Sequence, residues 1–185
     1  AKREGHETAL GVIDTDDLEA KVRDWKPDVV AFSVLTGEQR QYLDACRRLK
    51  QNASFLSIFG GLHPTFCPDE FMREDCVDAV CIGEGDGAFV ERLDELGTDA
   101  VHSVRNFWFN TPEGGVRNPL RPLLEDLAEL PWVDREILYD RSTFLRDHPI
   151  KRFTFERGCL YRCAYCFNQG YHELYGRRHP YVRAR

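Results

Sequence analysis

The sequence lacks a long hydrophobic run, an excess of positive charge and a secretory leader. No stretch approaches the roughly 18 apolar residues that a membrane-spanning helix needs, and the first residues do not follow the pattern of a signal peptide. Acidic residues outnumber basic ones by 31 to 25, for a formal net charge of -6. This balance argues against a protein whose main task is to grip nucleic-acid phosphates. We therefore expect a cytoplasmic protein that binds neither membranes nor nucleic acids.

The sequence also lacks internal repeats, low-complexity segments and an even set of cysteines. It has seven cysteines, and without a secretory leader they are expected to be reduced thiols or metal ligands, not a disulfide framework. The 185 residues, 42% of them hydrophobic and 30% charged, suffice for one complete domain and part of another.

Short apolar runs alternate with helical patterns over the first hundred residues. Expected strands cover residues 8–13, 29–34, 55–59 and 79–82. Expected helices cover residues 18–25 after capping residues at 14–17, then 38–52 and 68–75, and lastly a segment with Phe89, Val90, Leu93 and Leu96 on one face. This alternation predicts an α/β fold, a doubly wound Rossmann-like parallel sheet with helices on both sides.

The character of the chain changes after residue 100. A strand at 104–109 is followed by turn residues at 112–115, which predicts a hairpin. Prolines punctuate residues 117–140, and a further strand is expected at 152–155. We predict an α/β domain over residues 1–110, a linker over 111–150 and the start of a second domain over 151–185.

Both ends of the sequence resemble points at which a longer protein has been cut. There is no initiating Met, and residues 1–6 resemble the end of a helix with its terminal glycine, followed directly by a strand. At the other end the chain stops at Arg185, shortly after a cysteine motif. We expect a fragment in which the strand before that first helix, usually central in such a sheet, is missing.

The motif consists of Cys159, Cys163 and Cys166, in the spacing C-x3-C-x2-C. Thiolates suit iron–sulfur clusters and zinc. A 4Fe–4S cluster normally takes four cysteines, so three ligands leave one iron open for another molecule. The alternatives are a zinc site, with His172 or His179 as the fourth ligand, and buried thiols that bind no metal. The remaining cysteines lack ligand spacing and are expected to be core or surface thiols; they are Cys46, Cys67, Cys76 and Cys81.

With Gly158 before it and Tyr165 inside it, this segment resembles the signature of the radical S-adenosylmethionine enzymes. The resemblance implies a 4Fe–4S cluster on Cys159, Cys163 and Cys166, whose open iron chelates S-adenosylmethionine, with Tyr165 beside that cofactor. It also implies an electron donor such as flavodoxin or ferredoxin, and a radical S-adenosylmethionine β/α barrel that begins in residues 151–185 with its first strand and cluster loop.

Three of the predicted strand ends carry unusual residues. These ends are residues 33–36 (SVLT), 60–65 (GGLHPT) and 83–87 (GEGDG). Ligands of open α/β sheets bind at the carboxyl ends of strands, and glycine lets the backbone approach them closely. Taken singly, each segment is more often only a tight turn.

Together the three segments resemble the cobalamin-binding domain that precedes many radical S-adenosylmethionine modules. In that family Ser-x-Leu follows one strand and Gly-Gly the next, and here Ser33 precedes Gly60 by 27 positions. The resemblance implies that the cobalamin contacts are Ser33, Leu35, Thr36, Gly60, Gly61, His63, Gly83, Glu84 and Gly85. His63 is interpreted as a loop residue at the cofactor edge and not as a cobalt ligand. The region that would hold the Asp-x-His-x-x-Gly motif of other cobalamin domains is not part of this sequence.

These resemblances predict a cobalamin-dependent radical S-adenosylmethionine enzyme. The favoured reaction is methyl transfer to an unactivated carbon or phosphorus of a small-molecule or peptide substrate. Alternatives are a cyclisation or rearrangement within the same family, a non-catalytic cobalamin-binding module with a structural metal, and a nucleotide-binding α/β domain without a corrin. The chain alone is expected to be inactive.

Overall fold

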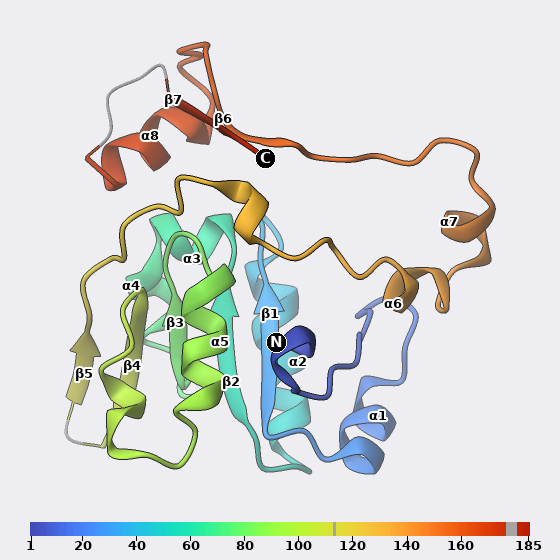
Figure 1. Cartoon of the computed structure of the whole chain (residues 1–185). Coiled ribbons are helices and arrows are strands. Elements are labelled where there is room, and N and C mark those ends of the chain that lie inside the picture. Colours follow the sequence, from blue (N-terminus) through green and yellow to red (C-terminus); the bar gives the residue numbers. More distant parts are fainter. Residues whose placement is uncertain (113, 177–180) are drawn as a thin grey trace. The chain divides into compact units, whose positions relative to one another are not determined.

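The computed structural model describes residues 1–112, 114–176 and 181–185, which form two compact units (Figure 1). The first unit comprises Ala1 and Gly11–Arg121, and the second comprises Lys2–Leu10 and Pro122–Arg185. In the part of the chain that the structure describes, no helix is both long enough and apolar enough to cross a membrane. The predicted domain boundaries near residues 110 and 150 stay a prediction.

The first unit is built on one five-stranded sheet with the order β1-β2-β3-β4-β5. Its strands are β1 (Val29–Ser33), β2 (Leu56–Gly60), β3 (Ala79–Cys81), β4 (Phe107–Thr111) and β5 (Gly114–Arg117). The first three are parallel neighbours, β4 is antiparallel to β3, and β5 is antiparallel to β4. All strands except β4 therefore run in one direction. The predicted hairpin is confirmed as the β4–β5 pair, although Glu113 of its turn lies outside the described residues.

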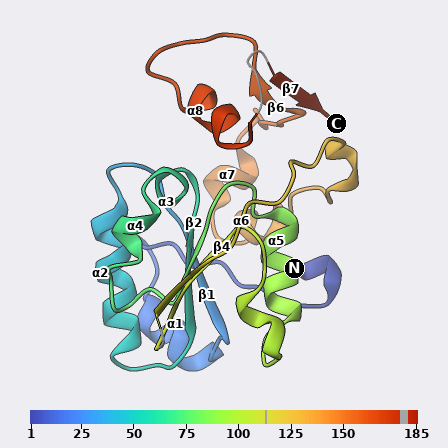
Figure 2. The same ribbon diagram turned by 90° about the vertical axis from the view of Figure 1, so that its left-hand side faces the viewer.

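Helices cover both faces of this sheet, as predicted. They are α1 (Leu18–Trp25), α2 (Gln39–Lys50), α3 (Leu62–Phe66), α4 (Pro68–Phe71), α5 (Asp86–Asp94) and a 3-10 turn, η2 (Asp99–His102). Figure 2 shows the sheet nearly edge-on, with α2 on one side and α5 on the other. The doubly wound α/β architecture is thus confirmed.

The two faces of β2 and β3 explain why every side chain of these strands except that of Ser57 is apolar. Phe59 and Val80 belong to one buried cluster, whereas their neighbours Ile58, Ala79 and Cys81 belong to another. Successive side chains of a strand point to opposite faces, so a strand covered on both sides has few polar positions. The buried Ser57 hydroxyl is satisfied by donating to the Cys76 carbonyl at 2.5 Å. Each fully buried aliphatic or aromatic side chain stabilises the fold by about 1.5–3 kcal/mol relative to exposure.

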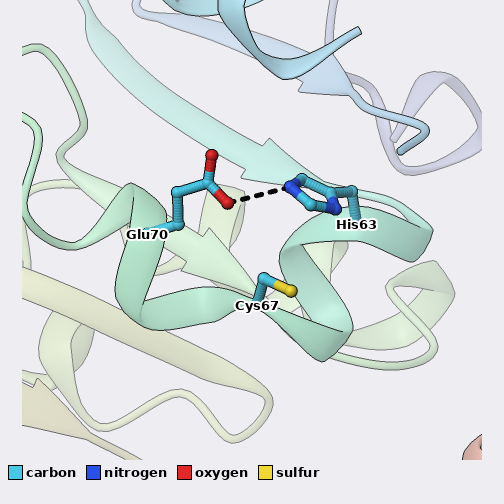
Figure 3. A group of neighbouring side chains, drawn as sticks. All are labelled: His63, Cys67 and Glu70. Carbon is cyan, nitrogen blue, oxygen red and sulfur yellow. Dashed lines mark hydrogen bonds and ion pairs between the residues drawn. The ribbon is translucent and has the colours of Figure 1, made fainter. Parts of the chain in front are cut away.

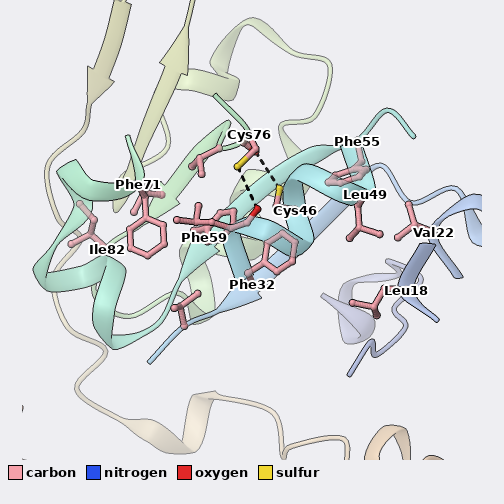
Figure 4. Close-up of a cluster of buried hydrophobic side chains, with 14 residues drawn as sticks. Leu18, Val22, Phe32, Cys46, Leu49, Phe55, Phe59, Phe71, Cys76 and Ile82 are labelled. Atoms are coloured by element: carbon pink, nitrogen blue, oxygen red, sulfur yellow. Dashed lines mark hydrogen bonds between the residues drawn. The ribbon is translucent and has the colours of Figure 1, made fainter. Parts of the chain in front are cut away.

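The larger buried cluster lies between the sheet and the α1–α2 side of the unit (Figure 4). The α2 stripe contributes Leu43, Cys46 and Leu49, as its spacing predicts. The Cys46 thiol donates to the carbonyl oxygen of Cys76 at 3.2 Å. Cys46 and Cys76 are buried, and so is Cys81, whereas Cys67 is exposed, so the expectation of core and surface thiols holds for the four cysteines outside the motif.

The strand predicted at residues 8–13 is wrong. The amides of Thr15 and Asp16 donate to the carbonyl oxygen of Val12, and an Asp16 carboxylate oxygen accepts from the Val12 amide at 3.0 Å. Asp16 thus closes a local turn and occupies backbone groups that a strand would need for pairing. Among the described residues, β1 pairs only with β2, and an apolar run without a neighbouring strand forms no ladder.

The second unit contains short elements and one two-stranded sheet. Its elements are η1 (Lys2–Glu4), η3 (Leu127–Glu129), α6 (Glu136–Tyr139), α7 (Thr143–Asp147), β6 (Glu156–Cys159), α8 (Phe167–Leu174) and β7 (Tyr181–Ala184). Strand β6 pairs antiparallel with β7, so the predicted strand at 152–155 is displaced toward the cysteines. Gly158 lies in this pair with φ +109°, where a Cβ would come 2.2 Å from the Tyr181 carbonyl oxygen. The barrel that β6 is expected to begin stays a prediction.

Candidate functional site

The loops after β1 and β2 are joined through their backbones. The amide of Val34 donates to the Gly60 carbonyl at 2.8 Å, and the Val34 carbonyl accepts from the His63 amide at 3.1 Å. Gly61 lies between these contacts with φ +97°, and a Cβ on it would come within 2.8 Å of the Val34 nitrogen and 2.9 Å of its oxygen. Glycine is therefore required at position 61 by a close approach of two backbones and by a left-handed conformation.

Thr65 joins the loop after β2 to the loop after β3. Its buried hydroxyl donates to the Gly61 carbonyl at 2.7 Å and accepts from the Gly83 amide at 3.0 Å. One side chain thus holds the two glycine loops at a fixed separation. Thr65 belongs to the GGLHPT segment, but no sequence signal indicated this role.

Asn106 supports the loop after β3 from the other side. It is 1% exposed and adopts φ +72°. Its side-chain amide donates to the Glu84 carbonyl at 2.7 Å, while its side-chain oxygen accepts from the Arg121 amide at 2.5 Å. No sequence signal identified this residue, because a single asparagine before a strand has no distinguishing pattern.

The three loops and the start of α5 surround a cavity of about 420 Å³. Five of the nine predicted cobalamin contacts line it: Ser33, Gly60, Gly61, Gly83 and Gly85. Its other walls include Ala31, Phe32, Ile58, Cys81, Asp86, Phe89 and Val90. The cavity is thus mainly apolar, with exposed main chain at the glycines and polar groups at Ser33 and Asp86. Its size falls in the lower half of the range for small-molecule sites.

The four other predicted contacts are not among the residues that line this cavity. Leu35 is 51% exposed, and Thr36 is also exposed. His63 lies in α3 (Leu62–Phe66), so its interpretation as a loop residue is wrong. It is buried, and its ring nitrogens meet the Thr36 hydroxyl at 3.2 Å and a Glu70 carboxylate oxygen at 3.1 Å. Contact of these residues, and of Glu84, with cobalamin stays a prediction.

Cys81 is the titratable thiol of the cavity wall. Burial raises its pKa to about 12, and the nearby Asp86 carboxylate adds to the effect. The group is therefore a neutral thiol at physiological pH, and it contributes to the cavity as a small apolar side chain.

The three motif cysteines follow β6 and lead into α8. All are half-buried. The amide of Cys166 donates to the Cys163 carbonyl at 3.0 Å, which closes a turn between them. Two N–H groups point at thiol sulfurs, the Tyr161 amide at Cys159 (3.4 Å) and the Asn168 side chain at Cys166 (3.5 Å). Such donors suit thiolate ligands, whose charge they stabilise.

The zinc alternative finds less support. His172 is 3% exposed and packs edge-on against Tyr181, with ring centroids 5.5 Å apart; His179 lies outside the described residues. Over the described ranges, the motif cysteines do not form a set of three ligand atoms within 4.8 Å of one another. The ligand atoms of a single tetrahedral zinc ion lie closer together than that, whereas thiolates bound to separate irons of a 4Fe–4S cluster lie farther apart.

Tyr165, the residue predicted to lie beside S-adenosylmethionine, is 93% exposed. Its side chain therefore makes little contact with the rest of the chain. Its proposed role stays a prediction.

Comparison with known proteins gives a family match over half of the chain. The model of the B12 binding domain matches residues 1–93. An uncharacterized methyltransferase of Pyrococcus horikoshii is 29% identical over 154 residues, which cover 81% of this chain and 33% of that protein. The chain thus spans about a third of this relative's length.

Two solved structures share the fold. One is the cobalamin-dependent S-adenosylmethionine radical enzyme OxsB with aqua-cobalamin and S-adenosylmethionine bound. Its TM-score is 0.65 at 21% sequence identity, and the match covers 84% of this chain and 22% of that one. The other is the radical S-adenosylmethionine methyltransferase TsrM from Kitasatospora setae with cobalamin and a [4Fe-4S] cluster bound. Its TM-score is 0.62 at 16% sequence identity, and the match covers 90% of this chain and 36% of that one. At these identities the likeness concerns the fold alone.

Proposed function

The chain belongs to the B12-binding domain family, and on that premise we propose that its first unit holds cobalamin in a cobalamin-dependent radical S-adenosylmethionine methyltransferase. The observation that carries the proposal is the cavity at the carboxyl ends of β1, β2 and β3, lined by five of the residues that the family resemblance designates. The methyltransferase relative supports the type of reaction.

The cavity of about 420 Å³ is smaller than a whole cobalamin molecule, so it accommodates one part of the ligand, and its residues fit that part. Gly60 and Gly61 expose main chain on one side of the cavity, and Gly83 and Gly85 do so on another. Any larger residue at position 61 would collide with Val34 before a ligand arrived. The walls supply apolar contact, and the Ser33 hydroxyl can donate to or accept from a polar group of the ligand.

When bound, cobalamin supplies a transferable methyl group. The contribution of the chain is to bind and orient it. The Thr65 hydroxyl and the Asn106 side chain keep the glycine loops in place, so the cavity exists before the ligand enters. A site formed in advance loses less conformational entropy on binding.

In the second unit, Cys159, Cys163 and Cys166 would hold a 4Fe–4S cluster, which supplies the electron that cleaves S-adenosylmethionine. Three protein ligands leave one iron for that molecule. The Tyr161 amide and the Asn168 side chain would stabilise the thiolates. The electron donor is proposed to be a small redox protein such as flavodoxin or ferredoxin.

The test is anaerobic reconstitution of the chain with iron and sulfide. We expect about four irons and four sulfides per chain, and the loss of both when the three cysteines are replaced by alanine. Cobalamin uptake should survive that replacement, because the cavity lies in the first unit. A chain that takes up cobalamin but binds zinc in place of iron would support the non-catalytic module instead.

Catalysis is proposed for a longer protein that contains this chain, because the chain covers 33% of its methyltransferase relative. That protein should release 5′-deoxyadenosine from S-adenosylmethionine and add the mass of one methyl group to its substrate. Deoxyadenosine release with a product of unchanged mass would favour a cyclisation or rearrangement.

A further inference from the structure

A cluster of three potential metal ligands lies just after β2, outside the cavity. His63 belongs to α3, Cys67 separates α3 from α4, and Glu70 belongs to α4. Their ligand atoms all lie within 4.8 Å of one another (Figure 3). In the described part of the chain, no other set of three His, Cys, Asp or Glu side chains meets this condition.

We propose that His63, Cys67 and Glu70 form a binding site for one zinc ion, with water in the fourth position. Imidazole, thiolate and carboxylate are the three zinc ligand types of proteins, and sites with three protein ligands keep one position open. The mixture of soft sulfur and harder nitrogen and oxygen favours zinc over magnesium or calcium, which take oxygen ligands.

The environment of His63 suits a ligand. Its ring is 7% exposed and packs edge-on against Phe71, with centroids 5.7 Å apart, which fixes the ring orientation. Its Nδ1 lies 3.2 Å from the Thr36 hydroxyl. When Nδ1–H donates to that oxygen, the lone pair of Nε2 faces Glu70 and Cys67. A hydrogen bond at the other ring nitrogen is the usual support of a metal-bound histidine.

The spacing of the three residues follows from the local backbone. Cys67 ends α3 and precedes Pro68 of α4, and its amide donates to the His63 carbonyl at 2.9 Å. Cys67 itself is not helical, with φ -128° and ψ 51°, so the three ligands come from two short helices and the residue that joins them. One pair of ligand atoms already has a separation that suits zinc, because Nε2 of His63 lies 3.1 Å from the Glu70 carboxylate.

Closure around an ion requires only small movements. Bonds of about 2.0–2.3 Å in a tetrahedron place ligand atoms about 3.5 Å apart. The largest separation allowed by the present geometry is 4.8 Å, and the two side chains that must move are accessible, since Cys67 is exposed and the Glu70 side chain is 44% exposed.

The site is separate from the proposed cobalamin function, because none of its three residues lines the cavity. Its ligands are nonetheless attached to both loops that the cavity uses, since Thr36 follows β1 and His63 follows Gly61. A bound ion would hold the two loops together more firmly than the hydrogen bonds alone.

The experiment uses the full chain with Cys159, Cys163 and Cys166 replaced by alanine, so that the motif cannot bind metal. After removal of metal with a chelator, the protein is titrated with Co²⁺, whose thiolate charge-transfer and tetrahedral ligand-field bands report a Cys-containing site. We expect one equivalent of Co²⁺ to bind and Zn²⁺ to displace it. Zn²⁺ should also raise the melting temperature.

In the same background, Cys67→Ser should abolish the charge-transfer band, and Glu70→Gln should weaken Zn²⁺ binding. Thr36→Val should weaken it about 10–100-fold, as expected for a supporting hydrogen bond. The matched control is Asp69→Asn, the neighbouring acid of α4, which pairs with Arg117 outside the cluster and should leave binding unchanged. Absence of the band, or its persistence in Cys67→Ser, would overturn the proposal.

Discussion

At the scale of single residues, Gly61 is the position that the fold constrains most clearly. Its φ is +97°, and a Cβ would come within 2.8 Å of the Val34 nitrogen. Gly61→Ala should therefore destabilise the chain by about 3 kcal/mol, the sum of left-handed strain and overpacking. Urea unfolding measures the loss.

The matched control for that substitution is Gly37→Ala. Gly37 has a similar φ of +100°, but nothing lies within 4 Å of its virtual Cβ. Strain alone should cost about 1–2 kcal/mol there. Equal losses at the two positions would show that the close approach of the two loops contributes nothing.

Cys81 makes the stability of the fold depend on pH. Burial raises its pKa from 9.0 to about 12, so the folded chain keeps a proton that the unfolded chain has already lost between these values. The unfolded state then binds fewer protons, and stability falls as pH rises. The contribution of Cys81 to stability is fully present below the pKa that the thiol has in the unfolded chain. It is lost as pH rises toward the pKa of the thiol in the folded chain.

We therefore expect the free energy of unfolding to fall more steeply between about pH 9 and about pH 11 in the wild-type chain than in Cys81→Ala. Denaturant titrations at a series of pH values test this. Parallel pH profiles for the two proteins would indicate that Cys81 is not sequestered. Alkylation provides a second readout, since exposed Cys67 should react well before Cys81.

At the scale of elements, Thr65 is the connection between the loops after β2 and β3. Thr65→Val leaves the Gly61 carbonyl and the Gly83 amide without the hydroxyl that joins them. We expect a loss of about 1–3 kcal/mol in stability, together with weaker cobalamin binding. Thr65→Ser keeps the hydroxyl and should restore most of both. If serine fails to restore them, the methyl group and not the hydrogen bonds is what matters.

The helices α1 and α2 were predicted more accurately than the strands expected at 8–13 and 152–155, and for a physical reason. Helix signals are local: Asp17 caps α1 by accepting from the Ala20 amide at 2.9 Å, as its position predicts. A strand also needs a partner, which composition does not reveal. Residues 8–13 are apolar but have no ladder, and β6 begins at Glu156, where it meets β7, instead of at residue 152.

At the scale of the whole molecule, the topology placed most of the site correctly. Parallel strands bring their carboxyl ends to one edge, so the glycines after β2 and β3 and Ser33 after β1 could be predicted to meet, and they do. Supporting contacts could not be predicted. Asn106 comes from the antiparallel extension of the sheet, and its bond to the Glu84 carbonyl depends on a packing that no spacing encodes.

The central claim is that the cavity at the carboxyl ends of β1, β2 and β3 holds cobalamin. The most direct measurement is titration of the purified chain with hydroxocobalamin, followed by visible absorbance and by retention of the corrinoid on gel filtration. We predict saturation at one cobalamin per chain. Ser33→Phe, which places an aromatic ring at the cavity wall, should abolish binding, whereas Ser103→Phe, at an exposed serine that does not line it, should not. Failure of the wild-type chain to retain cobalamin, or equal retention by Ser33→Phe, would contradict the account.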